Sequence, residues 1–117
     1  MRRAADPYKG RLGIPGGFVE VGETAENAVE RETKEEMNLD LTEVKFLFSV
    51  SNVYHFGGNI IYPCDLFFEC KAKSFDVIKI NNESEEFLWV PKEKIDLNAF
   101  AFESVKIALK KWLSNAT

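Results

Sequence analysis

A predicted helix over Thr24–Met37 has an unusual arrangement of acidic side chains. It holds five glutamates, which are Glu26, Glu30, Glu32, Glu35 and Glu36. At about 100° per residue, Glu32 and Glu36 fall within the arc of the apolar side chains, and Glu35 falls at its edge. These carboxylates therefore face the body of the protein. Buried carboxylates cost free energy unless they are neutralised, so this helix constrains both the fold around it and its chemistry.

Two interpretations of this helix are open from its own residues. An acidic surface helix would also be rich in glutamate, because charge runs usually lie on solvated faces. Three converging carboxylates would instead supply the hard oxygen ligands that Mg²⁺ or Mn²⁺ takes. The preceding Gly16-Gly17 favours the second interpretation. Glycine lets the backbone approach a ligand closely and leaves its carbonyls free to act as ligands.

The remaining residues predict a mixed α/β domain. Alternation and helical spacing predict strands at Leu12–Ile14, Val44–Phe56, Asn59–Ala72 and Phe87–Val90, and a second helix at Phe102–Leu113. Thr24 is the predicted N-cap of the first helix, and Asn38 is its predicted C-terminal left-handed residue. Gly57-Gly58 predicts a hairpin turn, and Pro63 predicts a bulge or an edge. The chain has 117 residues without a linker or repeat, so we expect one domain over residues 1–117.

Alternation also assigns side chains to faces of the two long strands. Phe46, Phe48 and Val50 are predicted on one face of the first strand. Cys64 and Cys70 are predicted on one face of the second, about 20 Å apart, which is too far for a disulfide. We expect both cysteines to be buried reduced thiols, and the protein to be cytoplasmic.

Composition excludes several classes of function. The chain is 45% hydrophobic and 29% charged, as globular proteins are. No apolar run approaches about 18 residues, so no membrane-spanning helix is predicted. The net charge of -4 argues against general nucleic-acid binding. An anionic substrate would need a local source of positive charge, and a bound metal ion is the usual one.

The segment Gly17–Leu39 resembles the Nudix box, Gly-x5-Glu-x7-Arg-Glu-U-x-Glu-Glu-x-Gly-U, where U is a bulky apolar residue. Five residues separate Gly17 from Glu23, and seven more precede Arg31-Glu32-Thr33-Lys34-Glu35-Glu36-Met37-Asn38-Leu39. The stretch Asp6–Glu20 and the tail from Phe87 are similar to the family's usual flanks. The resemblance implies an α+β fold, a Nudix-like α/β/α sandwich with a mixed sheet.

Two departures from the pattern accompany this resemblance. Asn38 stands where the family has glycine, and Thr33 stands where a bulkier apolar residue is common. Asparagine tolerates the left-handed conformation well, so we expect little effect. Family members usually carry two strands before the position of Met1. We therefore expect a sheet truncated at the N-terminus, with exposed edges that favour a homodimer.

The resemblance also implies roles for individual residues. Glu35 and Glu36 would be metal ligands, Glu32 a ligand or base, and the Gly16 carbonyl a further ligand of Mg²⁺ or Mn²⁺. Glu23 and Arg31 would form a structural ion pair. A further catalytic base would come from Glu83, Glu85 or Glu86, with Glu86 preferred. A solvated turn would explain these three acids equally well.

Substrate contacts are predicted at two positions. Arg3 could meet a phosphate, and Tyr54, like Phe56, could stack on a base. Solvation of the arginine and core packing of the rings are the alternatives.

The implied activity is metal-dependent cleavage of the diphosphate bond of a nucleoside diphosphate derivative. ADP-ribose or a dinucleotide is the favoured substrate, and a nucleoside triphosphate comes next. The alternative is a non-catalytic module of this fold that binds a nucleotide or a partner.

Overall fold

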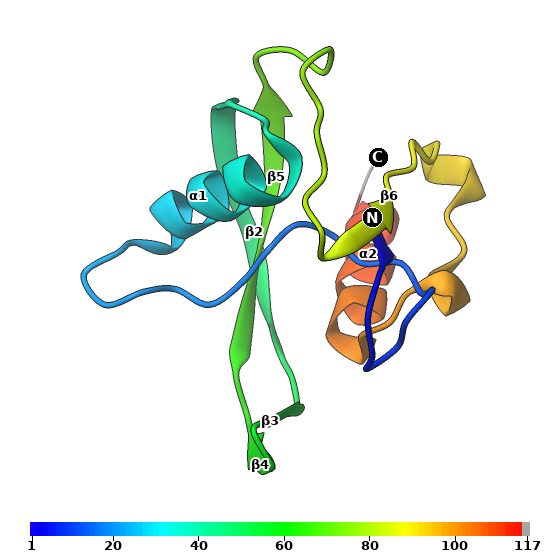
Figure 1. Ribbon diagram of the computed structural model, residues 1–117. Coiled ribbons are helices and arrows are strands. Elements are labelled where there is room, and N and C mark those ends of the chain that lie inside the picture. The colour runs from blue at the N-terminus through cyan, green and yellow to red at the C-terminus, as the bar shows by residue number, and fades with distance from the viewer. Residues whose placement is uncertain (116–117) are drawn as a thin grey trace.

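The computed structural model describes residues 1–115, except for the side chains of Phe56 and Asn115. Two α-helices, six strands and two short 3-10 helices make up an α+β fold (Figure 1). In chain order these elements are β1 Arg2–Arg3, α1 Ala25–Met37, β2 Leu41–Ser51, β3 Tyr54–Phe56, β4 Asn59–Ile61, β5 Cys64–Ala72, β6 Ser84–Glu86, η1 Lys92–Lys94, η2 Leu97–Ala99 and α2 Glu103–Asn115. None of the helices in this described part is long and apolar enough to cross a membrane.

Helix α1 begins and ends where its sequence predicts. The Thr24 side chain accepts a hydrogen bond from the Asn27 backbone N–H, which satisfies one free donor of the first turn. Asn38 ends the helix in the left-handed conformation, with φ 58° and ψ 34°. Asn38 thus occupies the position of the family's glycine without losing the C-cap.

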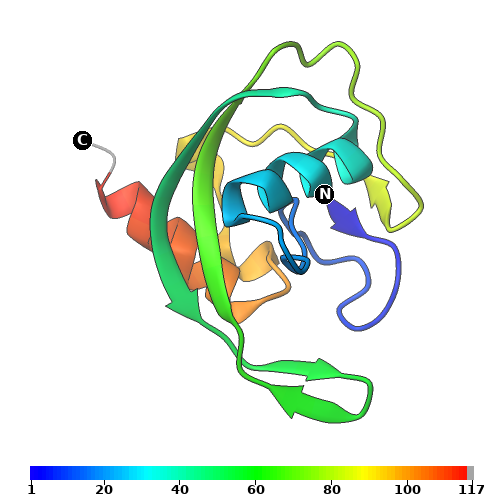
Figure 2. The same ribbon diagram turned by 90° about the vertical axis from the view of Figure 1, so that its left-hand side faces the viewer.

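Strands β2 and β5 form a long antiparallel ribbon, which the hairpin of β3 and β4 extends (Figure 2). The turn at Gly57-Gly58 is confirmed, and both glycines have positive φ. The predicted irregularity at Pro63 is also confirmed, because regular pairing stops between β4 and β5. The described strands form three antiparallel pairs, and parallel pairing occurs at the isolated bridge of Leu12 to Phe100.

A β-bulge changes which side chains of the ribbon are covered. Phe46 pairs with Phe68, but Phe48 pairs with Phe67, so Leu47 is the extra residue. The prediction that Phe46 and Phe48 share one face is therefore wrong. Phe46 is 50% exposed, whereas Phe48 is partly covered. Strict alternation could not anticipate a register shift that arises from pairing between two strands.

The two helices cover opposite faces of this ribbon at different points along it (Figures 1 and 2). Cys70 lies near Glu30 of α1, whose charge acts on the thiol. Asp65, five residues earlier on β5, accepts a hydrogen bond from Ser104 of α2. Successive strand side chains point to opposite faces, so this odd spacing puts the two contacts on opposite sides. The α/β/α arrangement is confirmed.

The prediction of two buried thiols is wrong for Cys64, and Cys70 is only partly covered. Cys64 is exposed and Cys70 is partly covered, and both are free cysteines. Because side chains alternate along β5, Cys64 lies on the same face of the ribbon as Cys70, at the opposite end of the strand.

The N-terminal segment closes the fold by short pairings instead of long strands. Strand β1 pairs with β6, and the strand predicted at Leu12–Ile14 is reduced to bridges from Leu12 to Arg2 and Phe100. The strand predicted at Phe87–Val90 is wrong, because the pairing with β1 engages Ser84–Glu86 instead. Buried apolar residues gather near α1 and the start of α2, at Ala28, Leu39, Phe100, Ala101, Val105 and Ala108.

Candidate active site at the glutamate helix

The loop that contains Gly16 and Gly17, called the glycine loop below, lies directly against the inner face of α1. A Cβ atom built at Gly17 would lie 2.5 Å from the Glu32 carboxyl carbon, closer than any real contact. The neighbouring Gly16 backbone N–H donates a hydrogen bond of 3.1 Å to Glu36 Oε2. A side chain at position 17 would therefore displace the Glu32 carboxylate, and the loop is held against two carboxylates of the helix.

Glu36 is the buried acid of this site, with 8% of the residue exposed. Burial raises the pKa of Glu36 to about 8, although the hydrogen bond from Gly16 opposes the rise. The neighbouring carboxylates of Glu32 and Glu83 raise this pKa further. Glu36 thus stands in apolar surroundings next to like charges, where a cation would be stabilising.

Arg31 joins the loop to the helix through several acceptors. Its Nε and Nη2 donate to the two carboxylate oxygens of Glu23 at 2.8 and 3.0 Å, and Nη2 also donates to the Phe18 carbonyl at 3.0 Å. The hydrogen bond from Arg31 lowers the pKa of Glu23, and the same contacts raise the pKa of Arg31. The expected ion pair is confirmed in a bidentate form.

Glu35 does not converge with the other two glutamates. Its carboxylate lies 3.4 Å from Arg31 Nη1, and its side chain is 56% exposed. Arg31 is one helical turn away on the same side, which is the usual spacing of such a pair. Arg31 also holds Glu32, at 2.7 Å.

Among residues 1–115, no three His, Cys, Asp or Glu side chains are gathered closely enough to hold a metal ion. The expected convergence of three carboxylates is therefore reduced to the pair of Glu32 and Glu36. Glu32 and Glu36 supply hard oxygen ligands that suit a divalent cation. Glu32 pairs with Arg31, and Glu36 is buried within reach of the charge of the Met1 ammonium group.

Glu83 and Glu86, near β6, have other contacts than expected: Glu83, not Glu86, is the acid close to the glutamate pair. Arg2 Nε donates to the Glu86 carboxylate at 2.6 Å, in an exposed ion pair at the β1–β6 edge. The charge of Glu83, not that of Glu86, acts on Glu36. Sequence alone could not separate these acids, because the pairing register of β1 with β6 decides which one faces the helix.

Arg3 and Tyr54 belong to one aromatic cluster. The Arg3 guanidinium lies 5.0 Å from the ring centre of Phe102, and the Tyr54 ring lies 6.0 Å from the same ring. Tyr8 contacts Phe102 edge-on at 5.6 Å, and Phe18 contacts Tyr54 at 6.0 Å. The sequence did not single out Tyr8 and Phe102 as members of this cluster. Tyr8 lies five residues after Arg3, and Phe102 begins the predicted second helix, so their positions offered a weak signal.

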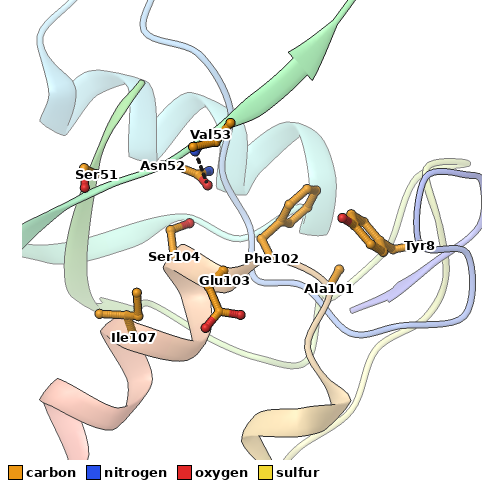
Figure 3. A pocket seen from close by; sticks show the side chains of 9 residues that line it. All are labelled: Tyr8, Ser51, Asn52, Val53, Ala101, Phe102, Glu103, Ser104 and Ile107. Atoms are coloured by element: carbon orange, nitrogen blue, oxygen red, sulfur yellow. Dashed lines mark hydrogen bonds between the residues drawn. The ribbon is translucent and has the colours of Figure 1, made fainter. Parts of the chain in front are cut away.

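A hollow of about 240 Å³ opens beside this cluster (Figure 3). Its lining comes from the lead-in loop (the segment between β1 and α1, here through Tyr8), from the end of β2 and from the start of α2. It consists of Tyr8, Ser51, Asn52, Val53, Ala101, Phe102, Glu103, Ser104 and Ile107. A second hollow, of about 370 Å³, lies at the C-terminal end of α1 and includes Lys34, Glu35 and Lys79.

The chain matches the family model of the NUDIX domain over residues 1–113. It therefore belongs to the NUDIX domain family. The loop, the glutamate pair and the Glu23–Arg31 ion pair described above lie within the matched residues.

Curated relatives extend this result. The chain is 52% identical over 50 residues to an ADP-ribose pyrophosphatase of Methanocaldococcus jannaschii, a match that covers 43% of this chain and 29% of that relative. It is 33% identical over 110 residues to the nucleoside triphosphatase NudI of Escherichia coli, which covers 86% of this chain and 77% of that relative.

A solved structure shows the same fold. It is a crystal structure of a protein assigned to the nudix hydrolase family from Chromobacterium violaceum, with a TM-score of 0.62 and 24% sequence identity. The match covers 86% of this chain and 61% of that one.

Proposed function

We propose that the chain hydrolyses the diphosphate bond of a nucleoside diphosphate derivative, with ADP-ribose or a dinucleotide as the favoured substrate. One observation carries the proposal. Two glutamates of α1 face the glycine loop, and one of them is buried with a raised pKa. Among the described residues no ion pair accounts for the burial of Glu36, whereas a site for a cation and a polyphosphate would account for it. The similarity to an ADP-ribose pyrophosphatase supports this substrate class.

A nucleoside triphosphate is the second candidate substrate. The match to the triphosphatase NudI runs over 110 residues, far more of the chain than the match to the ADP-ribose pyrophosphatase. Both substrate classes contain a phosphoric anhydride bond, so the same residues of α1 would serve either.

Glu32, Glu36 and the Gly16 carbonyl are the groups that would hold Mg²⁺ or Mn²⁺, with Glu35 available if it leaves Arg31. When bound there, such a cation neutralises charge on the diphosphate and promotes attack by water. Arg31 positions the loop, because it is tied to both Glu23 and the Phe18 carbonyl. Arg3 would contact a phosphate from the aromatic side.

The hydrolysis forms one P–O bond and breaks another. A water oxygen bonds to phosphorus, the anhydride P–O bond breaks, and a carboxylate accepts the water's proton. The products are a nucleoside monophosphate and a second phosphate compound. We expect Glu83 to be a better base than Glu86, because Glu86 is paired with Arg2 whereas the charge of Glu83 reaches Glu36.

A nucleotide panel tests this proposal. Purified protein is incubated with ADP-ribose, a dinucleoside polyphosphate and the nucleoside triphosphates, with Mg²⁺, Mn²⁺ or a chelator. Metal-dependent release of a nucleoside monophosphate from at least one class is the expected result. Nucleotide binding without hydrolysis of any compound would contradict the enzymatic proposal and favour a non-catalytic binding module.

We further infer a homodimer and a cytoplasmic location. In the described residues, β2 and β5 pair only with each other, and Phe46 and Leu66 are exposed on the ribbon. Open edges and exposed apolar side chains favour pairing with a second copy. The two free cysteines support a reducing compartment. Light scattering at several protein concentrations tests the dimer, and a monomer at every concentration would contradict it.

A further inference from the structure

The segment between β5 and β6 passes the C-terminal end of α1 and is bonded to it (Figures 1 and 2). The last carbonyls of an α-helix have no partner inside the helix and must find one elsewhere. The Lys79 backbone N–H donates to the Met37 carbonyl at 3.0 Å, and the Asn81 backbone N–H donates to the Glu36 carbonyl at 3.3 Å. The Asn81 side chain donates from Nδ2 to the Glu35 carbonyl, also at 3.3 Å. Two of the three bonds to this last turn of α1 therefore come from Asn81.

Asn81 also begins the turn that contains Glu83. Its Oδ1 accepts a hydrogen bond of 3.0 Å from the Glu83 backbone N–H, and its carbonyl accepts one of 3.3 Å from the Ser84 N–H. An asparagine side chain that bonds the backbone two residues on is typical of a tight turn. The Glu83 carbonyl accepts from the Ala4 N–H at 3.1 Å, beside the pairing of β1 with β6. Both backbone polar groups of Glu83 are thus bonded, and Asn81 supplies one of the two partners.

The backbone of Glu83 decides where its carboxylate lies. Glu83 is exposed, and in the described residues its carboxylate makes no hydrogen bond or ion pair of its own. Its charge nevertheless acts on Glu36. A base that takes a proton from water must lie within hydrogen-bond reach of that water. The turn that begins at Asn81 therefore controls whether Glu83 has this reach beside the last turn of α1.

We infer that Asn81 is a positioning residue for the hydrolysis, because its amide group joins the backbone of α1 to that of Glu83 and so sets the separation between the glutamate pair and the base. The inference rests on the proposed function, in which α1 holds the cation and Glu83 accepts the proton of water. Asparagine suits this role because its short side chain has both a donor and an acceptor. The donor is used on the helix and the acceptor on the turn.

Asn81→Ala removes both side-chain bonds at once. We expect kcat for the best substrate to fall by roughly 10- to 100-fold, because a displacement of about 1 Å in a reacting group is enough for such a loss. KM should change little, because no contact with the substrate is removed. Asn82→Ala is the matched control and should keep the wild-type kcat. Asn82 is the next residue, is exposed, and has no side-chain hydrogen bond in the part of the chain that the structure describes.

A double-mutant cycle with Glu83→Gln separates positioning from a general effect on the fold. Glu83→Gln alone should lower kcat by about 100-fold or more, the usual contribution of a general base. If Asn81 acts through Glu83, its loss should cost little once that carboxylate is absent. The variant Asn81→Ala/Glu83→Gln should therefore be about as slow as Glu83→Gln alone. A role in folding alone would lower the melting temperature of Asn81→Ala and leave the kcat of the folded protein unchanged.

The Glu83 amide signal gives a readout that needs neither metal nor turnover. In Asn81→Ala the temperature coefficient of its NMR shift should become more negative, as for an amide bonded to water, whereas Asn82→Ala should leave it unchanged. If the alanine variant does not fold, Asn81→Ser takes its place in the cycle. The serine side chain is too short to reach the Glu35 carbonyl but retains an acceptor for the turn.

The outcomes distinguish this inference from the proposed function. An active wild type whose kcat losses multiply in the double variant would overturn the inference and leave the proposed function standing. Near-normal kcat in Glu83→Gln, or in folded Asn81→Ala, would do the same. A wild type that hydrolyses no nucleotide would overturn both. Equal kcat in Glu83→Gln and the double variant, with a clear loss in Asn81→Ala alone, is the result that supports the role of Asn81.

Discussion

Glu36 Oε2 accepts a hydrogen bond of 3.1 Å from the Gly16 backbone N–H, and this contact joins the last turn of α1 to the loop that precedes the helix. The bond is made to the one carboxylate of the helix that is buried. It lowers the pKa of Glu36 but does not offset the effect of burial. The loop and the acid are therefore coupled, so a change at either one should alter the other.

Gly17→Ala should disrupt this coupling most directly. The added methyl group would lie 2.5 Å from the Glu32 carboxyl carbon, so the loop or the glutamate must move. Because the Glu32 carboxylate is the far end of a flexible side chain, we expect a change of at most about 1 kcal/mol in the free energy of unfolding, and a clear loss of activity. Gly13→Ala is the control, because a Cβ there meets nothing within 4 Å. Equal activity of the two variants would show that the close approach is absent in solution.

Glu36→Gln should abolish most activity while the fold survives. The substitution keeps the shape of the side chain and removes its charge, so the cation and polyphosphate lose their buried anionic partner. We expect turnover of the best substrate to fall by about 100-fold or more. Lys34→Ala is the control, because the exposed Lys34 ammonium group pairs with the exposed Asp40, away from the glutamate pair. Near-normal turnover by Glu36→Gln would contradict the assigned role.

Mg²⁺ or Mn²⁺ should raise the melting temperature of the wild type. A cation that binds only the folded state adds about 2.7 kcal/mol of stability at 100 times its Kd. Thermal melts over a range of metal concentrations measure this effect. The shift should shrink strongly in the double variant Glu32→Gln/Glu36→Gln. A shift of the same size in wild type and double variant would place the cation elsewhere.

Stability of the metal-free protein should depend on pH through Glu36. Its pKa is about 8 in the folded state, above the ordinary value of 4.5. Below pH 4.5 both folded and unfolded chains hold the proton. Between pH 4.5 and 8 the unfolded chain loses it while the folded chain retains it, so the stabilising contribution falls as pH rises and is lost above about 8.

Denaturation of wild type and Glu36→Gln in chelator, from pH 5 to 9, measures this dependence. Glutamine does not titrate, so the stability of the variant relative to wild type should increase toward pH 8. The lowered pKa of Glu23 acts below this range and is common to both proteins. A stability difference that stays constant with pH would show that Glu36 is ionised throughout.

Ser104→Ala should destabilise the start of α2. It removes a 2.7 Å hydrogen bond to the Asp65 carboxylate from a nearly inaccessible serine. Hydrogen bonds to charged groups contribute about 1.5–3 kcal/mol, so a decrease of that size is expected in urea denaturation. Ser114→Ala, at an exposed hydroxyl near the end of the same helix, should change stability by less than about 0.5 kcal/mol. Similar values for the two variants would contradict the importance of the buried bond.

The elements that could be predicted from sequence are those with local causes. Helix α1 has its own N-cap and C-cap residues, Thr24 and Asn38, and the hairpin has its own Gly57-Gly58 turn. The pair of Glu23 and Arg31 followed from the family resemblance, and its geometry is bidentate.

The parts that could not be predicted depend on contacts between distant segments. The register shift beside Leu47 arises from how β2 meets β5, and it places Phe46 and Phe48 on opposite faces, with Phe46 exposed. Glu35 pairs with Arg31, and the loop before α1 positions Arg31 through Glu23 and the Phe18 carbonyl. The hollow at Phe102 requires the lead-in loop, β2 and α2 to meet, which no single segment encodes.

The β2–β5 ribbon acts as a spacer between α1 and α2, because the two helices pack on its opposite faces. Helix α1, with the anhydride-cleaving end, rests on one face near Cys70, and α2, with the hollow, rests on the other face near Asp65. The bulge at Leu47 lies between these two contact points in the pairing register. The twist of one ribbon thus sets the distance and orientation between α1 and α2. Removal of the bulge would shift one helix relative to the other, without altering a single residue of either.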